Sequence, residues 1–213
     1  MAKGKLLVLE GIDGSGKSTQ VKKLKAYFVS KGIPTTAHRE PGGTALGEAV
    51  REILLGYNHQ NTELGKQTEF LLFASARAEL IREFVKPEIE DGNTVILDRF
   101  SASSVAYQGF GNGIDLGMID QVNQFVSENI TPDKVILLNI NPATALKRLN
   151  TPADRFEKRG IQFFDKVRKG YEYYADNNRE IVTVINGMLP EDEVFRQILI
   201  EIDDLFENKL HET

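Results

Sequence analysis

The sequence predicts an α/β protein built on a five-stranded parallel sheet flanked by helices. Apolar runs of strand length alternate with segments of helical periodicity along the 213 residues. This alternation is typical of parallel strands joined by right-handed helical crossovers. Hydrophobic residues make up 41% and charged residues 27% of the chain, as in an ordinary globular protein, and we expect one domain over residues 1–213.

The first half of the chain predicts three strands and three helices. Short apolar or β-branched runs indicate buried strands, and apolar residues spaced three and four apart indicate helices. We expect strands at 6–9, 35–38 and 94–97, and helices ending near Gly32, at 45–55 and at 67–85. The last of these should end before Pro87, because proline disfavours a helical conformation in the residue that precedes it.

The second half continues the same alternation. We expect strands at 135–140 and 181–185, and helices at 119–127, 143–149, 162–177 and 191–207. In an open parallel sheet, ligands lie beyond the carboxyl ends of the strands. Charged residues follow three of the predicted strands, namely Asp13 and Lys17, Arg39 and Glu40, and Asp98 and Arg99. The predicted fold therefore gathers these side chains at one edge of the sheet.

The glycine-rich segment after the first strand fits the phosphate-binding pattern G-x-x-x-x-G-K-[ST], reading Gly11-Ile12-Asp13-Gly14-Ser15-Gly16-Lys17-Ser18-Thr19. Glycines let successive backbone N–H groups curl around an oligophosphate, and the helix that follows adds its positive end. Lys17 can reach the β- and γ-phosphates, and the hydroxyl of Ser18 can bind Mg²⁺. The sequence therefore predicts a nucleoside triphosphate site.

Asp98 directly follows the third strand, where a phosphate-loop protein places its second Mg²⁺ contact, usually through water. The alternative is an acid that caps the next helix. The neighbouring Arg99 is a planar, permanently charged group suited to a phosphate. Four arginines fall near predicted strand ends and helix starts, namely Arg39, Arg51, Arg77 and Arg99. If several of them converge, they can hold a second phosphate beside the first, as a phosphoryl-transfer enzyme needs.

A basic segment at about 147–161 indicates a lid that closes over the triphosphate. It begins with Lys147 and Arg148 and continues through Asp154-Arg155-Phe156-Glu157-Lys158-Arg159. The alternative is a solvated connection between two helices.

Among the aromatic residues, Phe70 and Phe73 are core residues on helical spacing alone. Tyr107 and Gln108 stand among glycines and look exposed, which allows contact with a base or a sugar.

Several other functions are disfavoured. The net charge of −5 argues against general nucleic-acid binding. There is no cysteine, and the histidines are too far apart for a zinc site. The first apolar run is too short for a secretory signal and no run is long enough for a membrane span, so we expect a cytoplasmic protein without membrane contact. A GTPase switch is disfavoured because no Asn-Lys-x-Asp motif occurs.

Taken together, the motifs resemble the thymidylate kinase family of phosphate-loop nucleoside monophosphate kinases. Besides the phosphate loop, the resemblance rests on Arg39-Glu40-Pro41-Gly42-Gly43-Thr44, Gly47-Glu48-Ala49-Val50-Arg51, Leu72-Phe73-Ala74-Ser75-Ala76-Arg77, Asp98-Arg99-Phe100 and Ser103-Ser104-Val105-Ala106-Tyr107-Gln108-Gly109. It implies phosphorylation of dTMP to dTDP with ATP and Mg²⁺ in dTTP biosynthesis, a short lid, and a homodimer. A kinase for another deoxynucleotide remains the alternative enzyme, and a nucleic-acid-dependent ATPase is a third possibility.

The resemblance also implies roles for individual residues. Phe73 would stack on thymine, which moves it from the core to the site, and Arg77, Gln108 and Ser104 would meet the base edge. The sugar would lie against Tyr107 and Asp13, the dTMP phosphate would lie between Arg51 and Arg99, and Glu40 would order the acceptor near Mg²⁺. Because Ser15 stands where one branch of the family has a basic residue, the catalytic arginine would be Arg148 or Arg155, acting with Lys17 and Arg99.

Two further implications concern single positions. Ala102 stands where many members of the family carry aspartate, so no carboxylate is expected there. The peptide bond between Glu40 and Pro41 is expected to be cis, which would aim Glu40 and Arg39 into the acceptor site.

Overall fold

A computed structural model describes residues 4–57, 64–148 and 159–206 of the chain. Its centre is a five-stranded sheet with the strand order β2-β3-β1-β4-β5. The pairs are all parallel, as predicted. The strands are β1 (Leu6–Glu10), β2 (Thr35–Arg39), β3 (Thr94–Asp98), β4 (Lys134–Asn139) and β5 (Val182–Asn186). Each lies within two residues of its predicted range.

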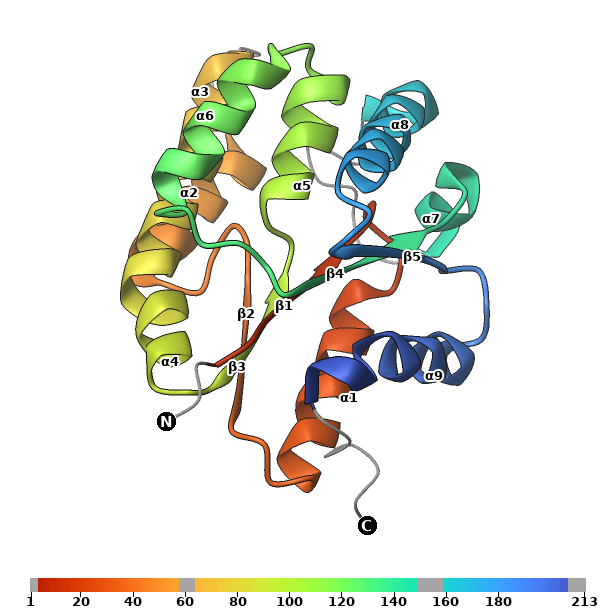
Figure 1. The fold of residues 1–213 in the computed structure, drawn as a ribbon. Coiled ribbons are helices and arrows are strands. Elements are labelled where there is room, and N and C mark those ends of the chain that lie inside the picture. The colour runs from red at the N-terminus through yellow and green to blue at the C-terminus, as the bar shows by residue number, and fades with distance from the viewer. Residues whose placement is uncertain (1–3, 58–63, 149–158, 207–213) are drawn as a thin grey trace.

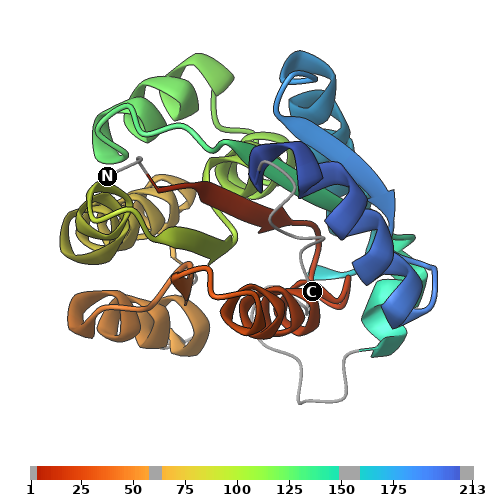
Figure 2. The ribbon, with the colours of Figure 1, turned by 60° about the horizontal axis from the view of Figure 1, so that its bottom comes forward.

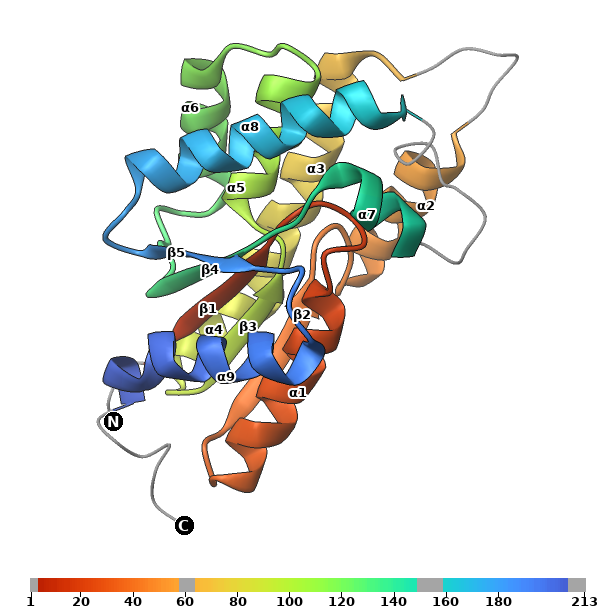
Figure 3. The same cartoon turned by 90° about the vertical axis from the view of Figure 1, so that its right-hand side faces the viewer.

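Helices cover both faces of the sheet (Figures 1 and 2). One face is covered by α1 (Lys17–Ser30) and α9 (Glu191–Ile202), which lie together below the strands in Figure 3. Leu7 and Leu9 of β1 point to this face and pack with residues of both helices. Successive strand residues point to opposite faces, so Leu6 and Val8 pack into the cluster on the other face. The buried apolar runs of the central strands follow from this double covering.

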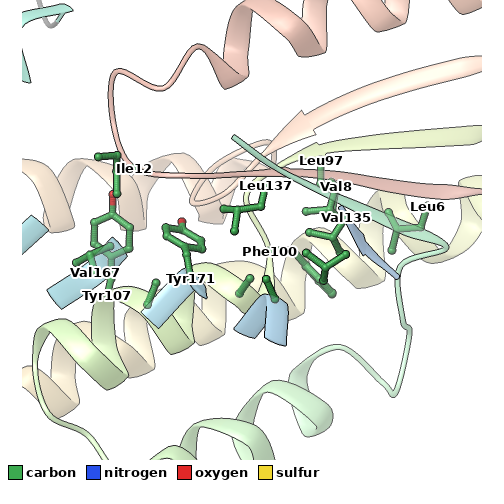
Figure 4. Close-up of a cluster of buried hydrophobic side chains, with 14 of the residues drawn as sticks. Leu6, Val8, Ile12, Leu97, Phe100, Tyr107, Val135, Leu137, Val167 and Tyr171 are labelled. Atoms are coloured by element: carbon green, nitrogen blue, oxygen red, sulfur yellow. The ribbon is translucent and has the colours of Figure 1, made fainter. Parts of the chain in front are cut away.

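The other face carries the remaining described helices, which are α2 (Ala45–Gly56), α3 (Lys66–Leu80), α4 (Lys86–Glu90), α5 (Ser101–Ser103), α6 (Leu116–Val126), α7 (Pro142–Arg148) and α8 (Ile161–Asn177). Figure 4 shows the core on this side. The rings of Tyr107 and Tyr171 lie beside Ile12 of the phosphate loop, and Phe100 lies farther along beneath the strand residues. Among the described residues, no helix is long and apolar enough to cross a membrane.

The predicted end of the third helix before Pro87 is wrong. A π-helical turn, Ile81–Val85, follows α3, and α4 then begins with Pro87 in its first turn. The N–H of Lys86 donates to the carbonyl oxygen of Ile81, five residues earlier. Proline is tolerated in the first turn because it has no N–H to leave unpaired there. The helical path therefore continues past the proline.

The expectation that Tyr107 and Gln108 are exposed is also wrong. They lie in a π-helical segment, Ser104–Gly111, which continues α5, and both are buried. Within this segment, positions 109 and 111 require glycine because neighbouring side chains pack tightly against them. A Cβ on Gly109 would lie 2.6 Å from Leu116 Cδ2, and one on Gly111 would lie 2.7 Å from Phe163 Cε2. The glycines mark close packing here, and not a loop.

The contact between α8 and the π-helical segment depends on Gly170. A Cβ at Gly170 would lie 2.6 Å from the Cα of Ala106 and 3.0 Å from the Cβ of Phe110. The first of these is a backbone atom, which cannot turn away as a side chain can. Any side chain at position 170 must therefore push α8 away from the residues that line the site.

We expect Gly170→Ala to destabilise the protein by about 1–3 kcal/mol through overpacking. This corresponds to a melting temperature lower by roughly 2–10 °C for a chain of this size, measured by circular dichroism. The matched control is Gly56→Ala at the end of α2, where a Cβ meets nothing within 4 Å, and which should be neutral or slightly stabilising. Equal melting temperatures for the two variants would contradict the tight contact.

Candidate active site

The phosphate loop connects β1 to α1 at the carboxyl edge of the sheet. Three of its glycines have positive φ, at 143° for Gly11, 79° for Gly14 and 96° for Gly16. A Cβ on Gly14 would lie 2.3 Å from the carbonyl oxygen of Ala145, so a larger residue would displace the loop from α7. Gly16 precedes the first turn of α1. The loop therefore has the backbone form that an oligophosphate needs.

Lys17 is buried, and its ammonium group donates to the carbonyl oxygen of Ile12 at 3.0 Å. Burial, together with the positive charge of Arg99, lowers the pKa of Lys17 to about 8, against the opposing effect of nearby carboxylates that include Asp98 and Asp13. A desolvated cation with one carbonyl partner is a strong attractor for phosphate oxygens. The charge needed for a triphosphate is therefore already present in the loop.

Ser18 and Asp98 meet across the sheet edge, and the hydroxyl of Ser18 donates to Oδ2 of Asp98 at 2.6 Å. The pairing of Leu9 with Asp98 between β1 and β3 sets this approach. Within the described part of the chain, no group of three His, Cys, Asp or Glu side chains could hold a metal ion. Two hard oxygen donors fit Mg²⁺, which commonly takes only one or two protein oxygens and completes its shell with water and phosphate.

Arg99 joins the phosphate loop to the helices on the other side of the site. Its guanidinium donates to the carbonyl oxygen of Gly11 at 2.9 Å, to Oδ1 of Asp13 at 2.5 Å and to the hydroxyl of Tyr171 at 3.0 Å. The group also lies 5.1 Å from the ring centre of Tyr107. Arg99 has φ at 76°, a conformation that non-glycine residues seldom adopt.

The charges around Arg99 stabilise one another. Burial raises the pKa of Asp13, but the positive charges of Arg99 and Lys17 outweigh it and hold that pKa at about 2. Burial opposes the charge of Arg99 as well, and Asp13 nevertheless keeps the pKa of the guanidinium well above its ordinary value. The hydroxyl of Tyr107 donates to the second oxygen of Asp13 at 2.9 Å. Asp13 and Arg99 therefore form a fixed ion pair at neutral pH.

Glu10, the last residue of β1, is a site residue that sequence reasoning missed. Its carboxylate accepts the backbone N–H of Phe100 at 2.7 Å, the hydroxyl of Ser103 at 2.7 Å and the hydroxyl of Tyr171 at 3.0 Å. Burial raises its pKa, against the opposing effects of Arg99 and these hydrogen bonds. An acid at the end of an apolar strand, directly before a phosphate loop, is the signal that could have identified it.

A pocket lies beside the phosphate loop and includes about 630 Å³ of empty space, part of it open to solvent. Its lining includes all nine residues that the family resemblance assigned to the acceptor nucleotide, which are Asp13, Glu40, Arg51, Phe73, Arg77, Arg99, Ser104, Tyr107 and Gln108. The structure thus brings them together from five separate segments of the chain.

A buried ion pair forms the floor of this pocket. Nε of Arg77 donates to Oε2 of Glu40 at 2.7 Å, and burial raises the pKa of Glu40 to about 7 against the charge of Arg77. The Glu40–Pro41 peptide bond is cis, as predicted. Oε1 of Glu40 is buried and has no hydrogen-bond partner among the described residues. That oxygen is available to a ligand or to water.

Arg77 is held in one position by further acceptors. Nη1 donates to the hydroxyl of Ser104 at 3.1 Å and to Oδ1 of Asn123 at 2.6 Å, and Nη2 donates to the carbonyl oxygen of Phe100 at 3.0 Å. Within the described residues, one N–H of Nη2 is left for a ligand. No sequence pattern pointed to Asn123, whose role depends on how α6 packs beside α3.

Two predicted residues lie outside the pocket. Arg39 is not aimed into the pocket, because its guanidinium pairs with the carboxylate of Glu48 at 2.8 Å on the surface. Arg148 donates to the carbonyl oxygen of Gly187 at 3.0 Å and lines a separate hollow next to Ser15 and Gly16. Residues 149–158, which contain Arg155 and most of the predicted lid, lie outside the described residues. The lid therefore stays a prediction.

Comparisons with known proteins agree with this geometry. Residues 9–198 match the thymidylate kinase family. The chain is 40% identical over 211 residues to a thymidylate kinase of Chlorobaculum tepidum, covering 94% of this chain and 97% of that one. It is 40% identical over 203 residues to one of Thermosipho melanesiensis, covering 95% and 99%.

A solved structure extends the likeness to the fold. The thymidylate kinase of Ehrlichia chaffeensis has a TM-score of 0.77 and 29% identity, and the match covers 95% of this chain and all of that one. The two chains thus share one fold over nearly their whole length. The chain belongs to the thymidylate kinase family.

Proposed function

We propose that the protein transfers the γ-phosphoryl group of ATP to dTMP and forms dTDP and ADP, a step of dTTP biosynthesis. The observation that carries this proposal is one pocket beside the phosphate loop, lined by all nine residues assigned to the acceptor. Asp13 belongs to the loop and to the pocket, and Arg99 donates to a loop carbonyl while it lines the pocket. An acceptor phosphate held there lies next to a triphosphate bound to the loop.

The polar atoms that remain available in the pocket fit the edge of a thymine. Arg77 has one unused N–H donor among its described contacts. Gln108 turns its amide nitrogen toward Glu69, at 3.2 Å, so its carbonyl oxygen is the atom offered to a ligand. Thymine presents O4, an acceptor, beside N3–H, a donor, whereas cytosine presents the opposite order. A wrong base would leave buried polar atoms unpaired, which permits strong discrimination.

The transfer itself needs little chemistry from side chains. An oxygen of the dTMP phosphate, already anionic at neutral pH, attacks the γ-phosphorus in line, and the bond to the bridging oxygen of ADP breaks. Arg51 and Arg99 orient the attacking phosphate, and Lys17 neutralises charge on the transferred group. Mg²⁺, held by Ser18 and Asp98 partly through water, would supply further charge neutralisation. An arginine of the lid segment, Arg148 or Arg155, would add the positive charge that Ser15 lacks.

Two further expectations belong to this proposal. We expect a homodimer, and the apolar side chains of Leu71 on α3 and of Met118 and Phe125 on α6 support it, since they are 57%, 53% and 84% exposed. The two helices lie together at one side of the molecule (Figure 1). Large exposed apolar groups of this kind mark interaction surfaces. The cytoplasmic location stays a prediction.

The direct test is a coupled assay of ADP formation from ATP with dTMP, dUMP, dCMP and dGMP as acceptors. We expect kcat/KM to be highest for dTMP, and lower for dCMP by a factor of about 10² or more. ATP or GTP without an acceptor should be hydrolysed far more slowly. Acceptor-independent GTP hydrolysis at the same rate would instead favour a GTPase, and equal rates with all four acceptors would contradict the assigned base pocket.

A second prediction follows from the pKa of Lys17. Because that pKa is about 8 in the free protein, Lys17 is mostly neutral at pH 9, and a bound triphosphate should restore its proton. ATP binding should then take up ~0.9 proton at pH 9 and ~0.1 proton at pH 7. Calorimetric titrations in buffers of different ionisation enthalpy measure this uptake.

The control for this measurement is Lys17→Met, which should abolish the uptake at pH 9 and lower kcat by at least about 10²-fold. Lys25→Met, on the exposed side of α1, should change neither quantity. Equal proton uptake at pH 7 and pH 9 would show that Lys17 is not the titrating group.

A third prediction separates the two roles of Phe73, which is half-buried, packs on the core and also lines the pocket. If it stacks on thymine, Phe73→Leu should weaken dTMP binding by roughly 1–3 kcal/mol and leave ATP binding unchanged. Phe84→Leu is the matched control, because Phe84 packs on the same core and stacks on His38 away from the pocket. The control should lower the melting temperature without affecting dTMP affinity. Unaltered dTMP binding in folded Phe73→Leu would return that residue to the core.

A further inference from the structure

Glu69 of α3 is a fully buried carboxylate that the reaction above does not use. Its Oε1 accepts the amide N–H of Gln108 at 3.2 Å and that of Asn112 at 2.7 Å. Its Oε2 accepts a guanidinium N–H of Arg159 at 2.6 Å. The carboxylate thus holds side chains from two segments that are far apart in the sequence, one with Gln108 and Asn112 and one with Arg159.

Arg159 supplies the charge that makes this arrangement stable. Its other guanidinium nitrogen donates to Oδ1 of Asn112 at 2.7 Å, and the group lies 4.7 Å from the ring centre of Phe163. A buried carboxylate is unfavourable unless a cation and hydrogen bonds compensate it. Arg159 provides this cation for Glu69, and the amides of Gln108 and Asn112 provide the hydrogen bonds.

An ionised carboxylate determines how the amide of Gln108 must point. It has only acceptor atoms, so the amide atom of Gln108 that faces it must be the nitrogen. The carbonyl oxygen of Gln108 has no partner among the described residues and belongs to a side chain that lines the pocket. An amide without such a neighbour can turn over and exchange its donor for its acceptor, since the two ends differ little in shape.

We propose that Glu69, paired with Arg159, is a positioning residue that fixes the Gln108 amide with its oxygen toward the pocket and thereby selects a base that offers an N–H there. The inference rests on the proposed function, because it assigns the origin of base selection within the same site. It gives the acid on α3 and the arginine before α8 a common role, although neither lines the pocket.

The test compares kcat/KM for dTMP and dCMP at saturating ATP in wild type and Glu69→Gln. Glutamine keeps the shape of the side chain but offers both a donor and an acceptor, so the amide of Gln108 is no longer fixed. We expect the dTMP/dCMP selectivity to fall about tenfold. The loss should appear mainly as a higher KM for dTMP, with kcat within about threefold of wild type.

Arg159→Gln tests the proposed effect of the Glu69–Arg159 pair on Gln108 without changing Glu69. Arg159 is partly exposed, so its substitution disturbs the packing less. Selectivity should fall in this variant and be largely restored in Arg159→Lys, which keeps the charge. The matched control is Arg168→Gln on α8, which breaks the exposed pair with Glu172 and should leave selectivity unchanged. Melting curves for every variant verify that each enzyme compared is folded.

A double-mutant cycle shows whether Glu69 acts through Gln108. In a Gln108→Ala background, Glu69→Gln should have no further effect on selectivity. Full selectivity in folded Glu69→Gln and Arg159→Gln, or an equal loss in the Gln108→Ala background, would overturn the inference while wild-type turnover of dTMP leaves the proposed function intact. A wild-type enzyme that does not prefer dTMP would instead overturn the proposed function.

Discussion

The active-site edge of the molecule depends on the position of Arg99. This residue directly follows β3, and its guanidinium extends to the phosphate loop after β1, where it binds the carbonyl oxygen of Gly11 and the carboxylate of Asp13. The same group meets the hydroxyl of Tyr171 on α8 and the ring of Tyr107. One permanently charged side chain thus holds the loop, the third strand, the π-helical segment and α8 in one arrangement.

Such an arrangement is favourable only because each buried charge has a partner. Removing one member of a buried pair leaves an uncompensated charge and typically destabilises by about 3–5 kcal/mol. The pairs Asp13–Arg99, Glu40–Arg77 and Glu69–Arg159 satisfy this condition. Two buried polar atoms that have no hydrogen-bond partner among the described residues lie at the site. Oε1 of Glu40 lies in the acceptor pocket and Oγ of Ser15 lies in the phosphate loop, where ligand atoms would meet them.

One of the two π-helical segments described above lies at the site. The π-helical segment Ser104–Gly111 carries Ser104, Tyr107 and Gln108, which all line the pocket. A π-helix has a wider turn than an α-helix and is common at functional sites. It places these side chains together, while Gly109 and Gly111 let the neighbouring elements approach closely. The pocket is therefore shaped by tight packing against rigid helices, which suits the discrimination of a small base.

The sequence alone determined the sheet, the phosphate loop and the family, because strand periodicity and the glycine–lysine motif are local patterns. Two predictions from the sequence were wrong, the helix end before Pro87 and the exposure of Tyr107 and Gln108. In both places helix continuation and packing outweighed the local preferences of proline and glycine. Only the tertiary structure decided that Arg39 pairs with Glu48 on the surface, and that Glu69 lies behind Gln108. No regular sequence spacing predicts which residues meet in these contacts. For a buried charge such as Glu69, the reason is that packing brings in the partners that its burial requires.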